Sequence, residues 1–98
     1  MKKNNKSDFL RKVVDEINNI PKVKVLTYGD ISIKINGNKD SSRAVGQAIK
    51  SETRSNSKFP WWRVVFATMK PKKGAEKHLK NEVIYMHDQK VPNQFLNR

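Results

Sequence analysis

Few side chains in this 98-residue sequence could take part in a chemical reaction. The sequence holds no cysteine, which excludes a thiolate nucleophile, a disulfide and a zinc site built on sulfur ligands. His78 and His87 lie too far apart to share one helical face, and we expect both imidazoles at the solvated surface. Glu82 and Asp88 have no evident catalytic partner. We therefore expect no metal, no cofactor and no hydrolytic site, and the sequence favours recognition over catalysis.

Both tryptophans of the chain stand next to each other in the stretch FPWWRVV. Trp61 and Trp62 follow Pro60 and lead through Arg63 into a short apolar run. Composition alone would make them a core pair beside a strand, because large aromatic side chains are usually buried. Their role depends on the elements that surround them.

The chain carries a formal net charge of +12, with 21 basic and nine acidic residues. Such an excess favours a polyanionic partner, because lysine and arginine release the counterions condensed on phosphates. Charge alone leaves open a ribosome or RNA partner as well as DNA. No apolar run approaches the length of a membrane helix, and the first residues do not resemble a signal peptide. We expect a cytoplasmic monomer, associated with the nucleoid if the source is prokaryotic, with no membrane partner.

The N-terminal half predicts a tail, a helix and an ambiguous segment. Residues 1–6 form a flexible basic tail, and residues 7–98 form a single domain. Apolar residues from Phe9 to Ile20 follow helical spacing, with Ser7 or Asp8 as the cap and Pro21 as the end. In residues 22–35, alternating apolar residues slightly favour a hairpin that turns at residues 28–30. The spacing of Thr27 and Asp30 instead suits a capping box, which would begin a helix.

The second half predicts a helix over residues 40–51, after a turn at residues 36–38. Asp40, Ser41 or Ser42 would cap this helix, which has one apolar face and one face with basic and amide side chains. Residues 51–58 suggest a polar loop, and residues 62–69 suggest a strand. A short helix follows around residues 75–81, and residues 83–91 suggest a closing hairpin around His87 and Asp88.

Three stretches resemble sequence blocks of the O6-alkylguanine-DNA alkyltransferases. IPKVKVLTYGDIS, SSRAVGQAIKS and FPWWRVV are similar, in this order, to the blocks IPxGxVxTYGxIA, ARAVGxAL and PCHRVV of that family. The resemblance extends from about Phe9 to about Val91. Trp61 stands where the enzymes carry the acceptor cysteine, as in the alkyltransferase-like proteins, whose usual block is PWHR. Departures from the family pattern include Trp62, where that block has histidine, Val23, where glycine is common, the shorter segment after Phe66, and the lack of a glycine after Glu82.

The resemblance implies a mainly α fold with a small β wing, a winged helix-turn-helix DNA-binding domain. It implies that residues 28–35 form a helix after a Thr27 cap, so that the hairpin prediction should fail. The predicted recognition helix is SSRAVGQAIK, which docks in the minor groove. The residues that the resemblance places at DNA or at the lesion are Tyr28, Ser41, Ser42, Arg43, Ala44, Gly46, Gln47, Lys50, Pro60, Trp61, Trp62 and Val64.

Each of these residues has an expected role. Arg43 is expected to enter the base stack as a finger, and Tyr28 to press against the flipped nucleotide. Ser41, Ser42, Gln47 and Lys50 would bind phosphates and sugars, while Ala44 and Gly46 would permit close approach to the groove. Trp61 would line the lesion pocket, with Pro60 shaping the turn and the Val64 backbone bonding the guanine edge. Trp62 is expected to be half structural, and Arg63 to form a structural ion pair.

The implied function is recognition of O6-alkylguanine in duplex DNA, with base flipping and a signal to nucleotide-excision repair proteins. Alkyl transfer to cysteine is excluded because the sequence has no such acceptor. An alternative is a general winged-helix DNA-binding or regulatory protein that has lost lesion recognition. A ribosome or RNA partner is the third possibility.

Overall fold

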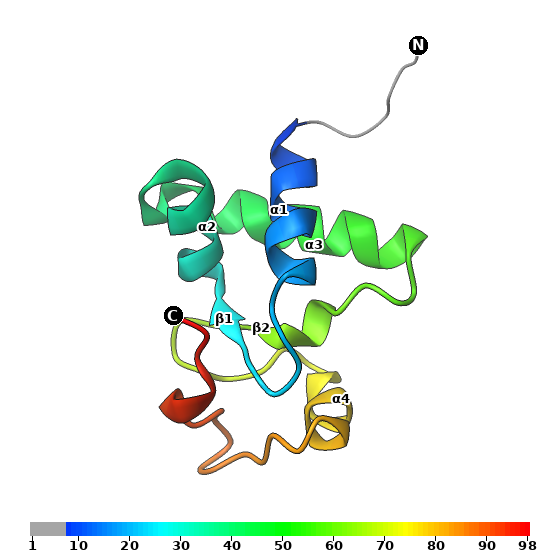
Figure 1. The fold of residues 1–98 in the computed structure, drawn as a ribbon, viewed down its shortest axis with the longest axis vertical. Helices are drawn as coiled ribbons and strands as arrows, with labels where there is room; N and C mark the ends of the chain where they lie inside the picture. The colour runs from blue at the N-terminus through cyan, green and yellow to red at the C-terminus, as the bar shows by residue number, and fades with distance from the viewer. Residues whose placement is uncertain (1–7) are drawn as a thin grey trace.

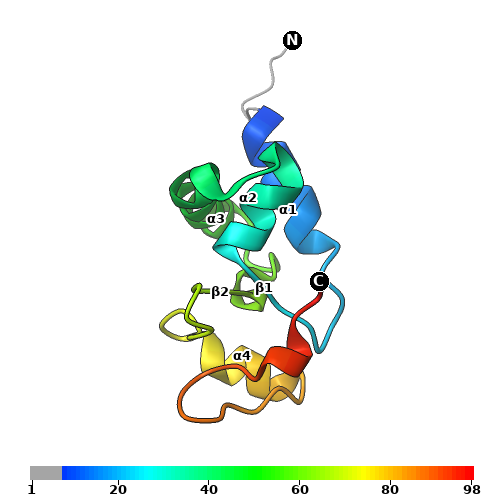
Figure 2. The same ribbon diagram turned by 90° about the vertical axis from the view of Figure 1, so that its left-hand side faces the viewer.

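Two lobes with a short parallel strand pair between them make up the computed structural model, which describes residues 8–98 (Figure 1). The predicted basic tail and the Ser7 cap lie outside the described residues. Three helices form the first lobe, and a short helix with the C-terminal segment forms the second, as the rotated view also shows (Figure 2). The helices and strands are α1 (Asp8–Asn18), β1 (Leu26–Thr27), α2 (Tyr28–Asn36), α3 (Ser42–Ser55), β2 (Val64–Val65) and α4 (Ala75–Asn81), with 3₁₀ turns at η1 (Lys39–Ser41), η2 (Trp61–Arg63) and η3 (Asn93–Phe95).

Each lobe has its own hydrophobic core, because each brings a separate set of apolar faces together. Most buried residues of the first core come from α1, α2, α3 and the strands, while Ile20 and Phe59 come from loops. The buried residues of the second core come from α4, β2, the C-terminal segment and Val25, which precedes β1. Trp61 is partly buried and packs against both cores. It therefore stands at the junction of the two lobes.

The predicted capping box begins α2. The Thr27 hydroxyl accepts a hydrogen bond from the Asp30 amide at 3.0 Å, and the Asp30 carboxylate accepts one from the Thr27 amide at 3.0 Å. Two amides that a helix start leaves without partners are thereby satisfied. The expected helix is confirmed and the hairpin is wrong. The helix ends at Asn36 and is capped by Gly37, whose φ of 83° lies in the left-handed region, as the predicted turn requires.

The third helix is longer than predicted. Ser41 is its N-cap by position, without a side-chain capping bond, while Ser42 is its first residue and Asp40 lies in η1. The polar loop predicted over residues 51–58 is confirmed for residues 56–58 and wrong for residues 51–55, because the helix continues to Ser55. Glu52 is buried within this last stretch, so the helix is extended by tertiary packing that its polar composition does not reveal.

The helix over residues 8–18 and the helix over residues 75–81 agree with the sequence prediction. Asp8 is the first residue of α1, not its cap. The fold class is also confirmed, since the molecule is mainly helical with a small sheet. Within residues 8–98, no helix is both long and apolar enough to span a bilayer.

The predicted β segments are shorter than expected. The strand predicted over residues 62–69 is confined to Val64–Val65, which pairs in parallel with Leu26–Thr27. The closing hairpin over residues 83–91 is reduced to an isolated bridge between His87 and Lys90. Asp88 and Gln89, with φ angles of 53° and 64°, form the two-residue turn between the bridged residues, whereas the φ of 65° at Val83 lies outside the extended region that a strand needs.

Candidate nucleic-acid interface

The exposed face of α3 carries most of the predicted DNA contacts. Val45, Ala48 and Ile49 are buried against α1 and α2. The opposite face is exposed and presents Arg43, Ala44, Gln47 and Lys50. The buried face fixes the orientation of the helix, so these four side chains point to solvent from a rigid element. Together they form one exposed surface that carries basic and amide groups.

The two serines at the start of α3 are engaged locally. The Ser42 hydroxyl donates to the Lys39 carbonyl at 2.8 Å. The Ser41 amide donates to the Ser32 hydroxyl at 3.0 Å, and the Ser41 hydroxyl accepts from the Asn36 side chain. These bonds fix the turn between α2 and α3. The structure therefore places both serines next to Arg43, and their phosphate contacts stay a prediction.

A first hollow of about 390 Å³ lies at the N-terminal end of α3. We call it the tyrosine hollow, and it is lined by Tyr28, Ser42, Arg43, Gly46 and Phe66. Burial raises the pKa of Tyr28 to about 12, so its hydroxyl stays protonated and able to donate a hydrogen bond at neutral pH. Sequence reasoning missed Phe66, because an aromatic residue after two valines is also what a buried strand would show.

Gly46 lies beside the tyrosine ring. A Cβ atom at this position would lie 3.7 Å from Cε1 of Tyr28, which is an ordinary van der Waals distance. The protein's own packing therefore does not require a glycine here. This agrees with a need for close approach by something outside the chain.

A second hollow of about 290 Å³ lies farther along the same helix. We call it the tryptophan hollow, and it is lined by Lys50, Thr53, Arg54, Trp61, Lys72 and Lys73. The Lys72 ammonium lies 5.7 Å from the centre of the Trp61 ring, within range of a cation–π interaction. Burial, and then the nearby charge of Lys50, lower the pKa of Lys72. The lining therefore carries uncompensated positive charge beside an aromatic face.

Trp62 and Arg63 lie in a closed polar network on Glu82. Nε1 of Trp62 donates to Glu82 at 2.8 Å, and Nη2 of Arg63 donates to the same carboxylate at 2.8 Å. Arg63 also donates to the carbonyl of Ile20 at 3.0 Å. The side chains of Arg63 and Glu82 are only 11% and 10% exposed, so the predicted structural ion pair of Arg63 is confirmed.

Two further features of this network concern Glu82 and Val23. Burial raises the pKa of Glu82, but hydrogen bonds from Arg63, Trp62 and the Val23 amide outweigh burial and hold the pKa below its ordinary value. Val23 donates that amide at 3.2 Å with a φ of 69°. A positive φ favours glycine, which explains why the resembling sequences commonly have glycine at this position.

The two histidines differ. His78 stacks on Trp62 with ring centres 4.4 Å apart and meets Trp61 edge-on at 5.5 Å. The prediction of a solvated imidazole is therefore wrong for His78, because α4 turns this residue towards the tryptophan pair. It is confirmed for His87, whose side chain is 84% exposed. Only the three-dimensional packing of α4 reveals the aromatic group of Trp61, Trp62 and His78.

Pro60 and Val64 are buried and flank the 3₁₀ turn η2, which carries Trp61. The Pro60 carbonyl accepts a hydrogen bond from the Arg63 amide at 3.2 Å, and the Val64 amide donates to the Trp61 carbonyl. Val64 also pairs with Leu26 in the parallel strand pair. Both residues thus hold the 3₁₀ turn that carries Trp61, and the predicted bond from Val64 to a guanine edge stays a prediction.

The family model for the DNA-binding domain of 6-O-methylguanine DNA methyltransferase matches residues 8–88. The chain belongs to this family. The match includes α2, α3 and the segment that carries Trp61. Because Trp61 occupies the place of the family's acceptor cysteine and the sequence holds no cysteine, the chain is an alkyltransferase-like member.

Relatives within the family agree with this assignment. A DNA base-flipping protein of Vibrio parahaemolyticus is 42% identical over 57 residues, which are 58% of this chain and 55% of that protein. The chain thus matches about half the length of this relative. The crystal structure of S. pombe Atl1 with DNA containing O6-carboxymethylguanine has a TM-score of 0.82 at 25% identity. A second S. pombe ATL structure with DNA has a TM-score of 0.78 at 26% identity, and both matches cover 97% of this chain and 99% of theirs.

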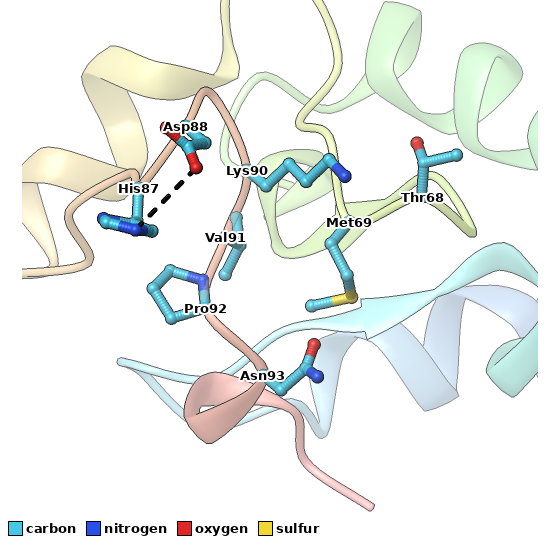
Figure 3. Close-up of a pocket in the computed structure, with 8 residues that line it drawn as sticks. All are labelled: Thr68, Met69, His87, Asp88, Lys90, Val91, Pro92 and Asn93. Carbon is cyan, nitrogen blue, oxygen red and sulfur yellow. Dashed lines mark ion pairs between the residues drawn. The ribbon is translucent and has the colours of Figure 1, made fainter.

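Another pocket, of about 420 Å³, lies in the second lobe and includes none of the predicted site residues (Figure 3). Thr68 and Met69 lie along one side of it, and His87, Asp88 and residues 90–93 line the rest. His87 and Asp88 form an exposed pair at 3.8 Å. Over residues 8–98, no group of three or more acidic, histidine or cysteine side chains is arranged to hold a metal ion.

Proposed function

We propose that this alkyltransferase-like protein binds duplex DNA through α3, extrudes an O6-alkylated guanine and holds it without transferring the alkyl group. The observation that carries the proposal is the arrangement along α3. An exposed basic face lies between two hollows, one with Tyr28 and Arg43 and one with Trp61. The relatives named as a base-flipping protein and as DNA complexes support the same reading.

Arg43 acts as the finger that enters the base stack. It is exposed in the first turn of α3 and lines the tyrosine hollow, so no internal partner has to be released before it reaches DNA. An alkylated guanine pairs poorly, which lowers the cost of extruding it. A planar guanidinium can fill the vacated space and donate to the unpaired base.

Trp61 receives the extruded base. Its indole offers an aromatic face and apolar surface, and each methylene of an alkyl group removed from water there contributes roughly 0.8 kcal/mol. Lys50, Arg54 and Lys72 around the hollow attract the adjacent phosphate. Burial of the alkyl group on the indole therefore distinguishes alkylated from normal guanine, while the attraction of the phosphate is the same for both.

The bound complex is an end point of recognition. Transfer to cysteine requires a thiolate, and the 98 residues contain none. We therefore infer that the protein is not an alkyltransferase and that repair of the lesion depends on other proteins. Nucleotide-excision repair proteins are the partners proposed to follow.

Binding to matched duplexes tests this function. Fluorescence anisotropy at a fixed salt concentration would compare duplexes with guanine and with O6-methylguanine at one position. We expect tighter binding to the damaged duplex, and loss of that preference in the variants Arg43→Ala and Trp61→Leu. Leucine keeps apolar volume at position 61, where the side chain packs against both cores.

The control variant is Lys77→Ala, which removes an exposed charge on α4 and is expected to keep the preference. Equal wild-type affinity for the two duplexes would reject lesion recognition and leave a general DNA-binding protein. Preferential binding to RNA that survives Arg43→Ala would reject the DNA function altogether.

A further inference from the structure

Phe66 is an exposed aromatic residue in a fixed position. Its side chain is 46% exposed, and it belongs to neither hydrophobic core. Its amide donates to the Lys70 carbonyl at 2.9 Å, and its carbonyl accepts from the Met69 amide at 2.7 Å. The turn thus holds the ring at the surface, where it contributes little to the burial of apolar area. A single exposed ring needs no explanation by itself, so what matters is what surrounds Phe66.

The ring of Phe66 extends the aromatic surface of Tyr28. The two ring centres are 5.5 Å apart at an interplanar angle of 34°. Both rings line the tyrosine hollow together with the Arg43 guanidinium and the bare backbone of Gly46. The hollow therefore combines two aromatic faces with a cation, and its lining contains no acidic side chain.

The tyrosine hollow is distinct from the tryptophan hollow. The two share no lining residue, although α3 contributes to both. Their residues on α3 lie about nine positions apart on average, or roughly 13 Å along the helix axis. Successive nucleotides of one strand are separated by roughly 3.4 Å along B-DNA. One extruded base therefore cannot occupy both hollows.

The chemistry of the tyrosine hollow fits a nucleobase. Successive bases stack on aromatic side chains and on arginine planes in proteins that bind unpaired nucleic acid. The net charge of +12 and the basic face of α3 favour a ligand that is attached to phosphate. An apolar peptide would gain nothing from that charge.

We propose that Phe66, together with Tyr28, forms a stacking platform for a second nucleobase in the flipped complex. That base is either the one left unpaired opposite the lesion or the one next to the lesion in the same strand. The inference rests on the proposed function, because either base has a free face only after the lesion has been extruded. Phe66 therefore contributes to holding the opened duplex, while Trp61 holds the lesion.

Substitution of Phe66 combined with fluorescent bases tests the platform. Phe66→Leu removes the ring and keeps apolar volume, and it is expected to weaken binding to the O6-methylguanine duplex roughly 5- to 100-fold. Phe66→Tyr keeps the ring and is expected to retain wild-type affinity. Tyr85→Leu is the matched control, because Tyr85 is also an exposed aromatic residue, at 59%, and lines neither hollow.

The fluorescent bases identify which nucleotide is stacked. Pyrrolocytosine would be placed opposite the lesion, and 2-aminopurine next to it, in separate duplexes. At one of these positions we expect weaker emission in the complex with the wild type than in the complex with Phe66→Leu, because stacking on the ring quenches the base. Quenching opposite the lesion identifies the unpaired base, and quenching beside it identifies the neighbour.

Failure of the platform differs from failure of the proposed function. Equal wild-type affinity for damaged and undamaged duplexes would reject lesion recognition itself. A wild type that discriminates, with a Phe66→Leu variant of the same affinity, would overturn only the platform. A loss of affinity without any Phe66-dependent change in emission would also overturn it, since Phe66 would then act through packing alone.

Discussion

The regions on the two sides of the tryptophan pair are built in opposite ways. On one side, Arg63, Glu82 and Nε1 of Trp62 form a closed network in which the charged side chains are about nine-tenths buried. On the other side, Lys50 and Lys72 with two further cations surround Trp61 in a hollow whose lining has no acidic side chain. Buried charges need partners, whereas solvent tolerates exposed cations until a polyanion binds. The closed side thus serves the fold, and the open side is available for DNA.

The largest effect is expected on the closed side. Glu82→Gln removes the anion and leaves the Arg63 cation buried, which should destabilise the fold by about 3 kcal/mol or more. Chemical denaturation at neutral pH measures this loss. Glu76→Gln is the matched control, because Glu76 is exposed on α4 and should change the stability by less than about 0.5 kcal/mol. Equal effects of the two variants would contradict the contrast between the two sides.

The pH dependence of stability also belongs to the closed side. The pKa of Glu82 lies below its ordinary value of 4.5, so the unfolded chain binds this proton more readily than the folded protein. The stabilising contribution is therefore complete above about pH 4.5 and is lost as the pH falls through the lower, folded-state pKa. Denaturation midpoints measured from neutral to acidic pH should fall in the wild type and fall less in Glu82→Gln.

The remaining acid dependence should come from Asp30. Burial raises the pKa of Asp30, but hydrogen bonds from Thr27 and Arg98 outweigh it, so the pKa again lies below its ordinary value. Adding Asp30→Asn to Glu82→Gln should further reduce the fall of the denaturation midpoint at acidic pH. If the denaturation midpoint falls equally in the wild type and in both variants at acidic pH, these carboxylates do not control the acid dependence of stability.

The open side should affect DNA affinity and leave stability unchanged. The double variant Lys72→Ala, Lys73→Ala is expected to lose roughly one to two phosphate contacts. Each lost contact should make the plot of log K against log salt concentration shallower by about 0.9. Stability should not fall, because burial and Lys50 already disfavour the charge of Lys72. Anisotropy at several salt concentrations and a denaturation curve provide the two measurements.

A matched pair of lysines tests whether position matters as well as charge. Lys12→Ala with Lys34→Ala removes the same net charge from a hollow that also contains Asp15 and Glu16. We expect this pair to change the salt dependence less. If both pairs reduce it equally, binding follows net charge and not the hollow around Trp61.

Local signals in the sequence identified several helices and their ends. The turn at Gly37 marked the end of α2, because turns depend on residues close in the sequence. The Thr27 and Asp30 capping box competed with a hairpin pattern at the start of α2, and the family resemblance decided for the helix. The exposed basic face of α3 could also be predicted from its helical spacing. The ion pair of Arg63 was expected, although only the structure shows that Glu82 is its partner.

Other features depend on contacts between distant residues. The approach of α4 brings His78 onto Trp62, and a turn at residues 66–70 holds Phe66 beside Tyr28. Neither position follows from periodicity. The predicted hairpin over residues 83–91 is reduced to its turn at residues 87–90, because Val83 adopts a positive φ angle where α4 ends. Tertiary packing decided the positions of His78 and Phe66.

The smallest expected effect separates the two adjacent tryptophans. Trp62→Phe keeps a ring that can stack on His78 and removes only the Nε1 donor to Glu82, which should cost about 1 kcal/mol of stability. Lesion preference should not change, because Trp62 lies on the closed side and does not line either hollow. Trp61→Leu, in contrast, should abolish the preference. If Trp62→Phe abolishes the preference as well, then Trp62 belongs to the lesion site. Both tryptophans would then belong to the open side, and only Arg63 and Glu82 would remain on the closed side.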